Sequence, residues 1–559
     1  MSNILGFQSG HDVSYFLMNN GQPLIHEELE RFSRVKEELG DGLKLFFDMQ
    51  PKDKCQQIKY FTFGNFGGRT NICKEKTIDN HSDEKMERLI QKNRGKFFEL
   101  SHHMTHAANA FFSSNFDDSL ILTIDGGGWE SDGTQTCATI YKGSNKNIEK
   151  IKVYSSDSLN IGNGWNYIAK LFGLSTGFPK GNQAGTVMAM ASMSNSTKYT
   201  NQLIDLMSNF DTMVQSADQP QALAKKLFNK VNFSEKDKFD ISSCLQQATE
   251  LLVRAVLDEH MAKYKPKNLC VSGGCALNSV LIGKIQSWYR HIDEIYVPPV
   301  PYDSGLAIGS AQYLWHQILG KERIKWVDNF SPYLGRKYSE FQVLDATKKF
   351  AVFLKTEKVD DNHILNLLNE QKIVSVFGGG SESGRRALGN RSILADPRNP
   401  KMKDLINEEV KHRQWFRPFA PSILREKVGL WFENDVSSPY MSHIIKWKKN
   451  VIKQIPAVVH FDGSARLQTV TEKDNFWYYN FLRKWEKISS VPILLNTSFK
   501  SGPFKLWGKA FLTMLASFEE LFLISSENLH HSSGGFSDKI SFFCIFSRCP
   551  KTSEPEPKF

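Results

Sequence analysis

The sequence predicts an α/β protein with a duplicated first domain and a smaller α/β second domain. Three observations support this fold class. A chain of 559 residues exceeds what one hydrophobic core usually organises. A pattern of strand, Gly/Asp loop and hairpin occurs twice, near residue 3 and again near residue 119. A further strand and glycine loop follow beyond residue 341.

The first copy of this pattern begins with the apolar segment NILGFQ (3–8). The loop SGHD follows, then VSYFLM (13–18), the turn NNGQ and PLIHEE (23–28). Short runs rich in apolar and aromatic residues, separated by Gly and Asn, predict three strands, with a hairpin between the second and third.

The second copy runs from SLILTID (119–125) through the glycine-rich loop GGGWESDG (126–133). The predicted strands TCATIYK (136–142) and IEKIKVYS (148–155) follow, with a turn between them. Two such copies facing each other are typical of actin- or sugar-kinase-like folds. Their glycine loops approach phosphates because no Cβ keeps the backbone N–H groups away.

Residues 160–330 are predicted to be helix-rich. The segments 268–279 and 295–315 interrupt them, and each predicts a strand, a glycine turn and a helix whose N-terminus faces an anion. We expect a linker around 328–340. The second domain then carries the strand KIVSVF (372–377) and a basic helical region.

Composition excludes several classes of protein. Hydrophobic residues make up 40% and charged residues 23%, as in soluble globular proteins. No run approaches the roughly 20 apolar residues of a membrane span, and the N-terminus turns polar too early for a signal peptide. The eight cysteines form no CxxC pair, so neither a disulfide framework nor a zinc ribbon is predicted. We expect a cytoplasmic protein that does not act at a membrane.

The formal net charge is +10, but the basic residues are spread along the chain and only KWKKNVIK (446–453) is dense. A nucleic-acid-binding protein would be expected to gather them in a stripe. Nucleic acid is therefore not the expected partner, whereas anionic small molecules fit the excess of Lys and Arg.

The segment HHMTH is a candidate metal motif. His102 and His106 are four residues apart and share one face of a helix that Ser101 is placed to cap. Paired imidazoles at this spacing commonly chelate a divalent ion. The HExxH peptidase motif is excluded, because Met104 and Thr105 occupy its inner positions.

Two histidines make an incomplete site, so carboxylates must come from elsewhere. Asp125, at the end of a predicted strand, and Asp303, in the turn YDSG, are the natural candidates. The alternative is a polar helix start with solvated histidines. The loops LTIDGGG and VSGGCALN resemble phosphate-binding loops, but glycine triplets also occur in ordinary turns. The segment GGGSESGRR (378–386) lacks the Gly-Lys-Ser/Thr ending of a P-loop and is rejected as one.

The segment NEEVKHRQWFRPFAPS (407–422) is a candidate anion site. Cations alternate in it with aromatic residues, which suits a pocket for a small phosphate or carboxylate better than a solvent face. The alternative is a basic surface helix with a buried edge. The residues concerned are Lys411, Arg413, Arg417, Trp415, Phe416 and Phe419.

Taken in order, ten motifs over residues 1–499 resemble the O-carbamoyltransferases of nodulation-factor and antibiotic biosynthesis. They are GHD, EELERFSR, SHHMTHAANAFF, LTIDGGG, VSGGCALN, YDSGLAIGSA, RRALGNRSILADPRNPKMKDLIN, VKHRQWFRPFAPSIL, FDGSARLQTV and PILLNTSF. The resemblance implies an ASKHA-like metal- and nucleotide-binding carbamoyl-transfer domain over 1–335. It also implies a YrdC-like domain that forms carbamoyl-adenylate over 341–499.

The resemblance also implies residue roles. His102, His106, Asp125 and Asp303 would bind one metal, Fe²⁺ or alternatively Zn²⁺. Gly127, Gly128, Gly273, Gly274 and Asn278 would line a nucleotide. Arg386, Lys411, Arg413, Arg417, Arg466 and Ser498 would hold carbamoyl phosphate and the phosphates of ATP, which Mg²⁺ would accompany.

The implied reaction has two steps. Carbamoyl phosphate yields carbamate, which attacks the α-phosphate of ATP to give carbamoyl-adenylate. A hydroxyl of a small natural product then attacks the carbamoyl carbon. We expect His11 to take the hydroxyl proton, because an imidazole near its free pKa suits that task. Acceptors in the family include sugars, cephems, aminoglycosides and tricyclic guanidinium alkaloids, and overall resemblance leans toward the saxitoxin pathway. The resemblance is compatible with a homodimer.

The chain departs from the family at three places. Where the family tends to have a Glu-Gly-Lys run, this chain has Ala184 and Thr186 in place of the Glu and the Lys, which puts a nucleotide contact there in doubt. Arg385 replaces a usual proline and either adds a cation beside the pocket or loosens the turn. Lys500 replaces an Asn, and residues 500–559 match no family pattern, so we hypothesise a shifted reading frame there.

Two alternatives to the O-carbamoyltransferase remain. One is an inactive metal-binding scaffold with a degraded C-terminal domain. The other is a tRNA threonylcarbamoyl-transfer protein, which the long block from RALGNRS to FRPFAPS disfavours.

Overall fold

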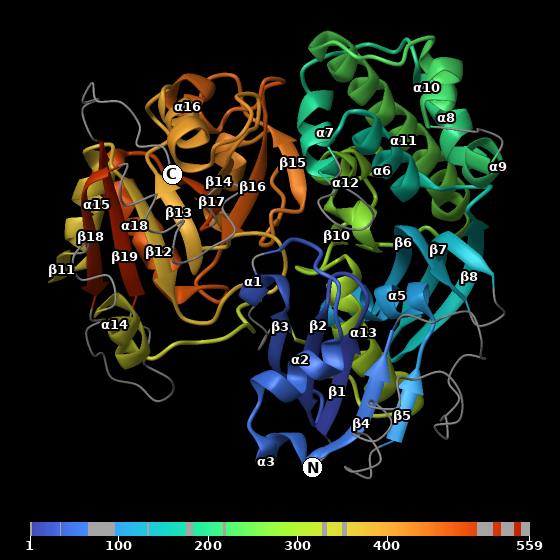
Figure 1. Cartoon of the computed structure of the whole chain (residues 1–559), viewed down its shortest axis with the longest axis horizontal. Coiled ribbons are helices and arrows are strands. Elements are labelled where there is room, and N and C mark those ends of the chain that lie inside the picture. Colours follow the sequence, from blue (N-terminus) through green and yellow to red (C-terminus); the bar gives the residue numbers. More distant parts are fainter. Residues whose placement is uncertain are drawn as a thin grey trace, which may run out of the picture.

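The computed structural model describes residues 3–33, 35–64, 96–130, 134–174, 183–215, 220–326, 332–348, 355–499, 518–526 and 541–548. Two five-stranded sheets and one nine-stranded sheet organise these residues (Figure 1). Within them, no helix combines the length and the apolar character needed to cross a membrane.

The first five-stranded sheet and its surroundings take in residues 3–113. Their elements are β1 (Asn3–Gln8), β2 (Ser14–Asn19), β3 (Gln22–Glu28), α1 (Glu30–Ser33), α2 (Gly42–Met49), α3 (Lys52–Cys55), β4 (Ile58–Phe63), β5 (Lys96–Glu99) and α5 (His102–Ser113).

The second five-stranded sheet and its helices follow. Their elements are β6 (Asp118–Trp129), β7 (Gln135–Ser144), β8 (Asn147–Ser155), α6 (Ile161–Leu171), α7 (Ala184–Ala191), α8 (Thr200–Ser208), α9 (Phe210–Gln215), α10 (Pro220–Phe228), α11 (Glu235–Tyr264), β9 (Asn268–Ser272), α12 (Ser279–Trp288), β10 (Glu294–Tyr296) and α13 (Leu306–Tyr313).

These two sheets share one topology, which confirms the predicted duplication. In the first, β1 pairs antiparallel with β2 and parallel with β4, giving the order β3-β2-β1-β4-β5. In the second, β6 pairs antiparallel with β7 and parallel with β9, giving the order β8-β7-β6-β9-β10. Each sheet is therefore a three-strand meander extended by two parallel strands beside its first strand.

Helices α5 and α13 lie between the two sheets, and every residue of both is buried. Small residues allow the close approach. A Cβ at Gly309 of α13 would overlap the carbonyl oxygen of Thr105 in α5, and one at Gly6 of β1 would overlap that of Ala307. The first turns of α5 are thereby fixed at the centre of the first domain.

The helices α6 to α12 cover the other face of the second sheet. Their apolar side chains form one large core with residues of β6, β7 and β9, including Leu122, Ile140 and Leu269. The longest helix, α11, begins with a capping box made by Ser234 and Asp237.

The second domain is built on the nine-stranded sheet, with the order β11-β18-β19-β12-β13-β17-β14-β16-β15. Its elements are α14 (Glu340–Lys348), β11 (Lys355–Lys358), α15 (Asp361–Asn369), β12 (Ile373–Gly378), β13 (Arg391–Ala395), α16 (Met402–Leu405), β14 (Ala420–Leu424), α17 (Val428–Trp431), β15 (His443–Lys446), β16 (Ser464–Val470), α18 (Phe476–Ser489), β17 (Ile493–Ser498), β18 (Phe518–Ser526) and β19 (Ser541–Arg548).

The central strands of this sheet are buried on both faces. Ile373, Ile393 and Ile493 point into a core with α16 and α17. The next residues along the same strands, including Val374 and Leu394, point into a second core with α15 and α18. Alternate side chains of a strand face opposite sides, so apolar residues occupy neighbouring positions in these strands.

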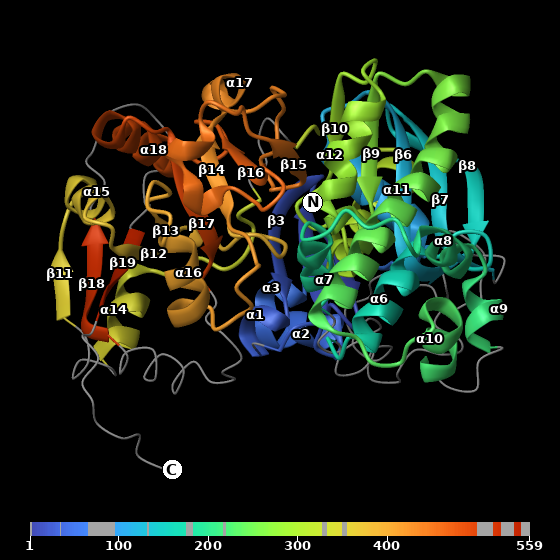
Figure 2. The same ribbon diagram turned by 90° about the horizontal axis from the view of Figure 1, so that it is seen from above.

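The two domains pack directly against each other (Figure 2). Helix α12 of the first lies on β15 of the second, and a Cβ at Gly283 would overlap the carbonyl oxygen of Ile444. The predicted boundary at 335 falls between α13 and α14, and that at 341 falls at the start of α14. Both boundaries stay predictions.

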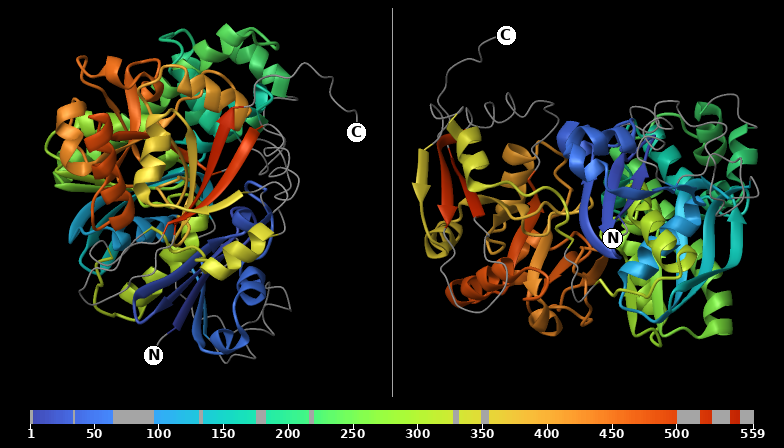
Figure 3. Two further views of the ribbon diagram at one scale, coloured as in Figure 1. Left: turned by 90° about the vertical axis from the view of Figure 1, so that its left-hand side faces the viewer. Right: turned by 90° about the horizontal axis from the view of Figure 1, so that it is seen from below.

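Two parts of the structure differ from, or lie beyond, the sequence expectations. The predicted loop GGGWESDG is partly strand, because β6 continues through its glycines to Trp129, with a register shift between Ile124 and Gly128. Most of the predicted atypical tail, 500–559, lies outside the described residues. Strands β18 and β19 of that tail pair between β11 and β12 (Figure 3).

Candidate functional site

The two histidines of the predicted metal motif meet on the first turns of α5. The Nε2 atoms of His102 and His106 are 3.1 Å apart, and both side chains are buried. Ser101 precedes the helix as expected, but its side chain makes no capping hydrogen bond. Its hydroxyl instead donates to Glu130 Oε2 at 3.1 Å.

Asp125 of β6 and Asp303, which opens the turn before α13, complete the group. His106 Nε2 lies 2.9 Å from Asp125 Oδ2 and 3.5 Å from Asp303 Oδ1. His102 Nε2 lies 3.5 Å from Asp125 Oδ2. One ligand atom from each of the four side chains lies within 4.8 Å of the others. The fold therefore brings together residues that are far apart in the sequence.

The charges of this group suit a cation. Burial disfavours a charged His106, but hydrogen bonds to Asp125 and Asp303 outweigh it and raise its pKa to about 9. Burial disfavours the Asp125 carboxylate as well, yet its two histidine partners hold its pKa well below the usual range. Two imidazole nitrogens and two carboxylates are a donor set that Zn²⁺ and Fe²⁺ accept. The residues present fit a divalent metal.

His103 lies beside these ligands and points elsewhere. Its Nδ1 contacts Thr123 Oγ1 at 2.8 Å, and its Nε2 contacts the carbonyl oxygen of Thr136 at 3.0 Å. Burial and the neighbouring His102 and His106 lower its pKa well below the usual value. His103 is thus a neutral structural residue that does not belong to the group of His102, His106, Asp125 and Asp303.

His11, in the loop after β1, faces the same group from the opposite sheet. Its Nε2 lies 3.4 Å from Asp303 Oδ2, and its Nδ1 lies 3.1 Å from Asp12 Oδ2. Burial lowers its pKa, but the charges of Asp303 and Asp12 outweigh burial and raise it to about 9. The expectation of a pKa near the free value is therefore wrong for His11.

The predicted nucleotide residues divide into two sets. Gly127, Gly274 and Asn278 line a cavity of about 820 Å³ that also reaches Asp125, Asp303 and His11. The other two glycines allow close packing: a Cβ at Gly128 would overlap the ring of His102, and one at Gly273 would overlap the carbonyl oxygen of Ile124. Asn278 also caps α12 by accepting from the Leu281 N–H at 3.1 Å.

The same cavity extends to the second domain. Its wall there includes all four predicted arginines and the predicted serine, namely Arg386, Arg413, Arg417, Arg466 and Ser498. Lys411 does not line it. The Lys411 amine instead donates to the backbone carbonyl and hydroxyl oxygens of Ser498, which fixes the end of β17.

The arginines crowd one another. Burial, together with Arg386, Arg413 and Arg417, holds the pKa of Arg466 well below its usual value. Burial and nearby arginines lower the pKa of Arg386 to about 10 and that of Arg413 to about 9. Among the described residues, none of the four forms an ion pair with a carboxylate. Because arginine stays protonated in proteins, this is a cationic cluster built to receive an anion.

Neutral neighbours hold these side chains in place. Arg413 Nε donates to Asn407 Oδ1 at 2.7 Å, and its guanidinium lies 4.5 Å from the centre of the Phe419 ring. Arg417 Nη1 donates to Thr186 Oγ1 of the first domain at 3.2 Å. Thr186, one of the departures from the family, thus contacts the cationic cluster across the domain interface.

Arg385 is the main residue that sequence reasoning left unassigned. Its guanidinium pairs with Asp12 and, at 3.2 Å, with Glu37, and it lies 4.2 Å from the ring centre of Tyr302. Of the two expectations for this position, the added cation beside the pocket is confirmed. Its neighbours in the first domain are far away in sequence, so no local pattern could have revealed them.

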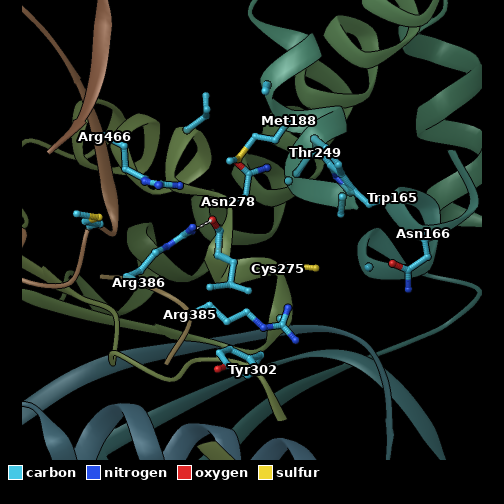
Figure 4. Close-up of a pocket in the computed structure, with 18 of the residues that line it drawn as sticks. Trp165, Asn166, Met188, Thr249, Cys275, Asn278, Tyr302, Arg385, Arg386 and Arg466 are labelled. Atoms are coloured by element: carbon cyan, nitrogen blue, oxygen red, sulfur yellow. Dashed lines mark hydrogen bonds between the residues drawn. The ribbon is translucent and has the colours of Figure 1, made fainter. Parts of the chain in front are cut away.

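The first-domain end of the cavity adds further residues that the sequence did not single out. They are Trp165, Asn166, Met188, Thr249 and Cys275 (Figure 4). Trp165 Nε1 donates to Thr249 Oγ1 at 2.9 Å, which fixes the indole. These five side chains are uncharged, unlike the arginines of the second-domain wall.

Sequence comparisons identify related proteins. The profile described as Carbamoyltransferase N-terminus matches residues 71–312, and that described as Carbamoyltransferase C-terminus matches residues 365–504. An uncharacterized protein of Methanocaldococcus jannaschii is 31% identical over 89% of this chain and 93% of its own length. The nodulation protein NolO of Bradyrhizobium diazoefficiens is 31% identical over 72% of this chain and 73% of its own. A nodulation protein U of Rhizobium fredii is 36% identical over 42% and 38%.

Solved structures show only distant similarity. The HypF protein of T. kodakarensis aligns with a TM-score of 0.33 and 12% identity, covering 56% of this chain and 47% of its own. A second HypF structure, in a phosphate- and nucleotide-bound form, aligns with the same TM-score over 57% of this chain and 56% of its own.

Proposed function

The chain belongs to the carbamoyltransferase family, and we propose that it is an ATP-dependent O-carbamoyltransferase whose acceptor is a small molecule bearing a hydroxyl. The observation that carries this proposal is the shared cavity. One space of about 820 Å³ touches both the metal-type carboxylates of the first domain and the arginine cluster of the second. A reaction in two parts, with an intermediate that need not leave the protein, fits this arrangement.

The first part takes place at the arginine cluster. Water converts carbamoyl phosphate to carbamate and phosphate. A carbamate oxygen then forms a bond to the α-phosphorus of ATP while the bond to pyrophosphate breaks, giving carbamoyl-adenylate. Arg386, Arg413, Arg417 and Arg466 bind the phosphate oxygens and offset the negative charge that gathers in the transition state. Their lack of carboxylate partners leaves these charges available to the substrates.

The second part takes place at the carboxylate and histidine group. His102, His106, Asp125 and Asp303 would hold the metal, Fe²⁺ or Zn²⁺, which supplies Lewis-acid character toward phosphate oxygens when bound. The acceptor hydroxyl oxygen attacks the carbamoyl carbon, AMP leaves, and His11 Nε2 takes the proton. His11 needs a free Nε2 for this step. A cation held by Asp303 would offset the negative charge that raises the pKa of His11.

Purified protein tests this proposal. It is incubated with ATP, Mg²⁺ and carbamoyl phosphate, and we expect pyrophosphate and carbamoyl-adenylate to form only when all three are present. Formation of ADP, or no pyrophosphate at all, contradicts the proposal. No pyrophosphate with a metal still bound favours the inactive scaffold. Addition of an aminoglycoside, a cephem, a simple sugar or a tricyclic guanidinium alkaloid alcohol then identifies the acceptor class by carbamoylated product and AMP.

A further inference from the structure

The motif EELERFSR places a buried ion pair at the domain interface, on the first-domain side. Glu28, at the end of β3, accepts from Arg31 of α1, with Glu28 Oε2 lying 3.3 Å from Nε and 3.2 Å from Nη2. The Tyr302 hydroxyl donates to the other oxygen of Glu28. Contacts within the first domain alone therefore hold the Glu28–Arg31 pair in place.

This pair forms hydrogen bonds with the backbone of one residue of the second domain, Gly384. Glu28 Oε2 accepts from the Gly384 N–H at 3.2 Å, and Arg31 Nη2 donates to the Gly384 carbonyl oxygen. Arg31 Nη2 also lies 3.4 Å from the carbonyl oxygen of Glu382. Both hydrogen-bonding groups of Gly384 are therefore taken by a single Glu–Arg pair.

Gly384 suits this contact because of its shape. It has a φ of +92°, and a Cβ there would overlap the carbonyl oxygen of Pro299. Only glycine combines that backbone conformation with so close an approach. The segment 378–386, which the sequence excludes as a P-loop, thus docks on the first domain through Gly384.

The docked loop leads directly into the cationic cluster. Glu382 Oε1 accepts the backbone N–H groups of Leu388, Asn390 and Arg391 at 2.8, 2.9 and 3.0 Å, which shapes the chain that follows. Arg386, two residues after Gly384, lines the cavity and donates to the Leu277 carbonyl oxygen at 3.2 Å (Figure 4). The docked residue Gly384 is therefore only two residues away from a guanidinium that lines the cavity.

We propose that Glu28 and Arg31 of the first domain are positioning residues for the carbamoyl phosphate and ATP site of the second domain, acting through Gly384 on Arg386. The inference rests on the proposed function and deepens it. It makes the first half of the reaction depend on the first domain, although the pair lies outside the cavity wall and touches no substrate. A contact that only stabilised the interface would lower the melting temperature and leave substrate affinity unchanged.

The test measures pyrophosphate release from carbamoyl phosphate and ATP, which needs no acceptor. The variants are Arg31→Gln, Arg31→Lys and Glu28→Gln. We expect Arg31→Gln and Glu28→Gln to raise the KM for carbamoyl phosphate about tenfold with a smaller change in kcat. A displaced Arg386 would bind the substrate and the transition state more weakly to a similar extent, and such a loss appears mainly in KM. Arg31→Lys keeps the positive charge but replaces the two contacting guanidinium nitrogens by a single amine on a differently shaped side chain, so its KM should lie between.

A double-mutant cycle separates positioning from simple stability. Arg31→Gln is combined with Arg386→Gln, and we expect no further rise in KM over Arg386→Gln alone, since both changes act on one guanidinium. The control is Glu486→Gln, which removes the 2.8 Å ion pair with Lys427 away from the cavity. It should leave KM at the wild-type value.

The outcomes are distinguishable. If the wild-type protein releases no pyrophosphate, the proposed function fails, and this inference with it. If the wild type is active and folded variants of Arg31 or Glu28 keep its KM, the inference alone is overturned. If Arg31→Gln does not fold, the KM of Arg31→Lys decides, and an unchanged value overturns the inference.

Discussion

The two ends of the cavity have opposite electrostatics. In the first domain Asp125 and Asp303 face His102, His106 and His11, so carboxylates meet imidazoles and the pKa values of His106 and His11 rise to about 9. In the second domain Arg386, Arg413, Arg417 and Arg466 face one another, and their pKa values fall. The histidines and aspartates of the first domain neutralise one another, and a cation must displace the histidine protons to bind there. The arginines of the second domain have no carboxylate partner among the described residues, so an anionic substrate can neutralise them.

This difference assigns the two parts of the reaction. A cluster with unmet positive charge binds the polyphosphate substrates without a change in its own protonation. A group that holds protons in the absence of a cation must release them when the metal binds. Changes at the two ends should therefore have separable effects on metal binding and on substrate binding.

The largest expected effect is on metal affinity. His106→Ala and Asp125→Asn each remove one of four ligands, and we expect the affinity for Zn²⁺ to fall at least about 100-fold. Competition with a fluorescent chelator measures this. The matched control is His103→Gln on the same helix, which removes a buried imidazole that faces Thr123 and Thr136. A loss in the control as large as that in His106→Ala would show that general damage to α5 explains both.

The next effect concerns the cationic end. Arg466→Gln removes one buried charge-assisted contact, and we expect the KM for carbamoyl phosphate to rise about 30-fold in the pyrophosphate assay. Zn²⁺ affinity should not change. Arg425→Gln is the control, since Arg425 pairs with Asp435 and does not line the cavity. An Arg466→Gln protein with normal KM would remove this arginine from the substrate site.

A pH dependence sharpens the contrast between the ends. Below pH 9 His106 carries a proton, which must leave before the imidazole can bind a metal. Affinity for Co²⁺ should therefore increase with pH by about tenfold per unit for each proton released, and level off above pH 9. Titration followed by the visible absorption of Co²⁺ between pH 6 and 8.5 checks this. A flat profile over that range would mean that metal binding displaces no proton.

The smallest effect tests whether the two ends are held together by domain packing. Gly283→Ala places a Cβ of α12 on the Ile444 carbonyl oxygen of β15, and we expect a loss of about 1–3 kcal/mol in the free energy of unfolding. Gly185→Ala is the control, because a Cβ there meets nothing within 4 Å. Thermal unfolding of both variants gives the comparison. Equal melting temperatures would contradict close packing of the two domains at this point.

Much of the fold could be read from the sequence because the repeated strand, loop and hairpin pattern is local. The spacing of His102 and His106 likewise follows from helical periodicity, and Asp125 and Asp303 stand at recognisable strand and turn positions. The environment of His11 could not be predicted, since its raised pKa depends on Asp303, nearly three hundred residues away in the sequence. Nor could Arg385, whose partners Asp12 and Glu37 belong to the other domain.

The roles of the individual motif glycines also could not be predicted from the sequence. Gly127 and Gly274 line the cavity as expected, yet Gly128 and Gly273 serve close packing behind it. A glycine motif indicates that a backbone approaches something closely. Only the fold says whether that neighbour is a ligand or another part of the chain.

The most direct test of the account follows carbamoyl-adenylate itself in two variants. Radiolabelled carbamoyl phosphate and ATP are given to Asp125→Asn and to Arg466→Gln at substrate concentrations near the wild-type KM. We expect Asp125→Asn to release pyrophosphate and accumulate carbamoyl-adenylate, and Arg466→Gln to form little of either. Loss of pyrophosphate release in Asp125→Asn, or normal adenylate formation in Arg466→Gln, would contradict the division of the reaction between the two ends of the cavity.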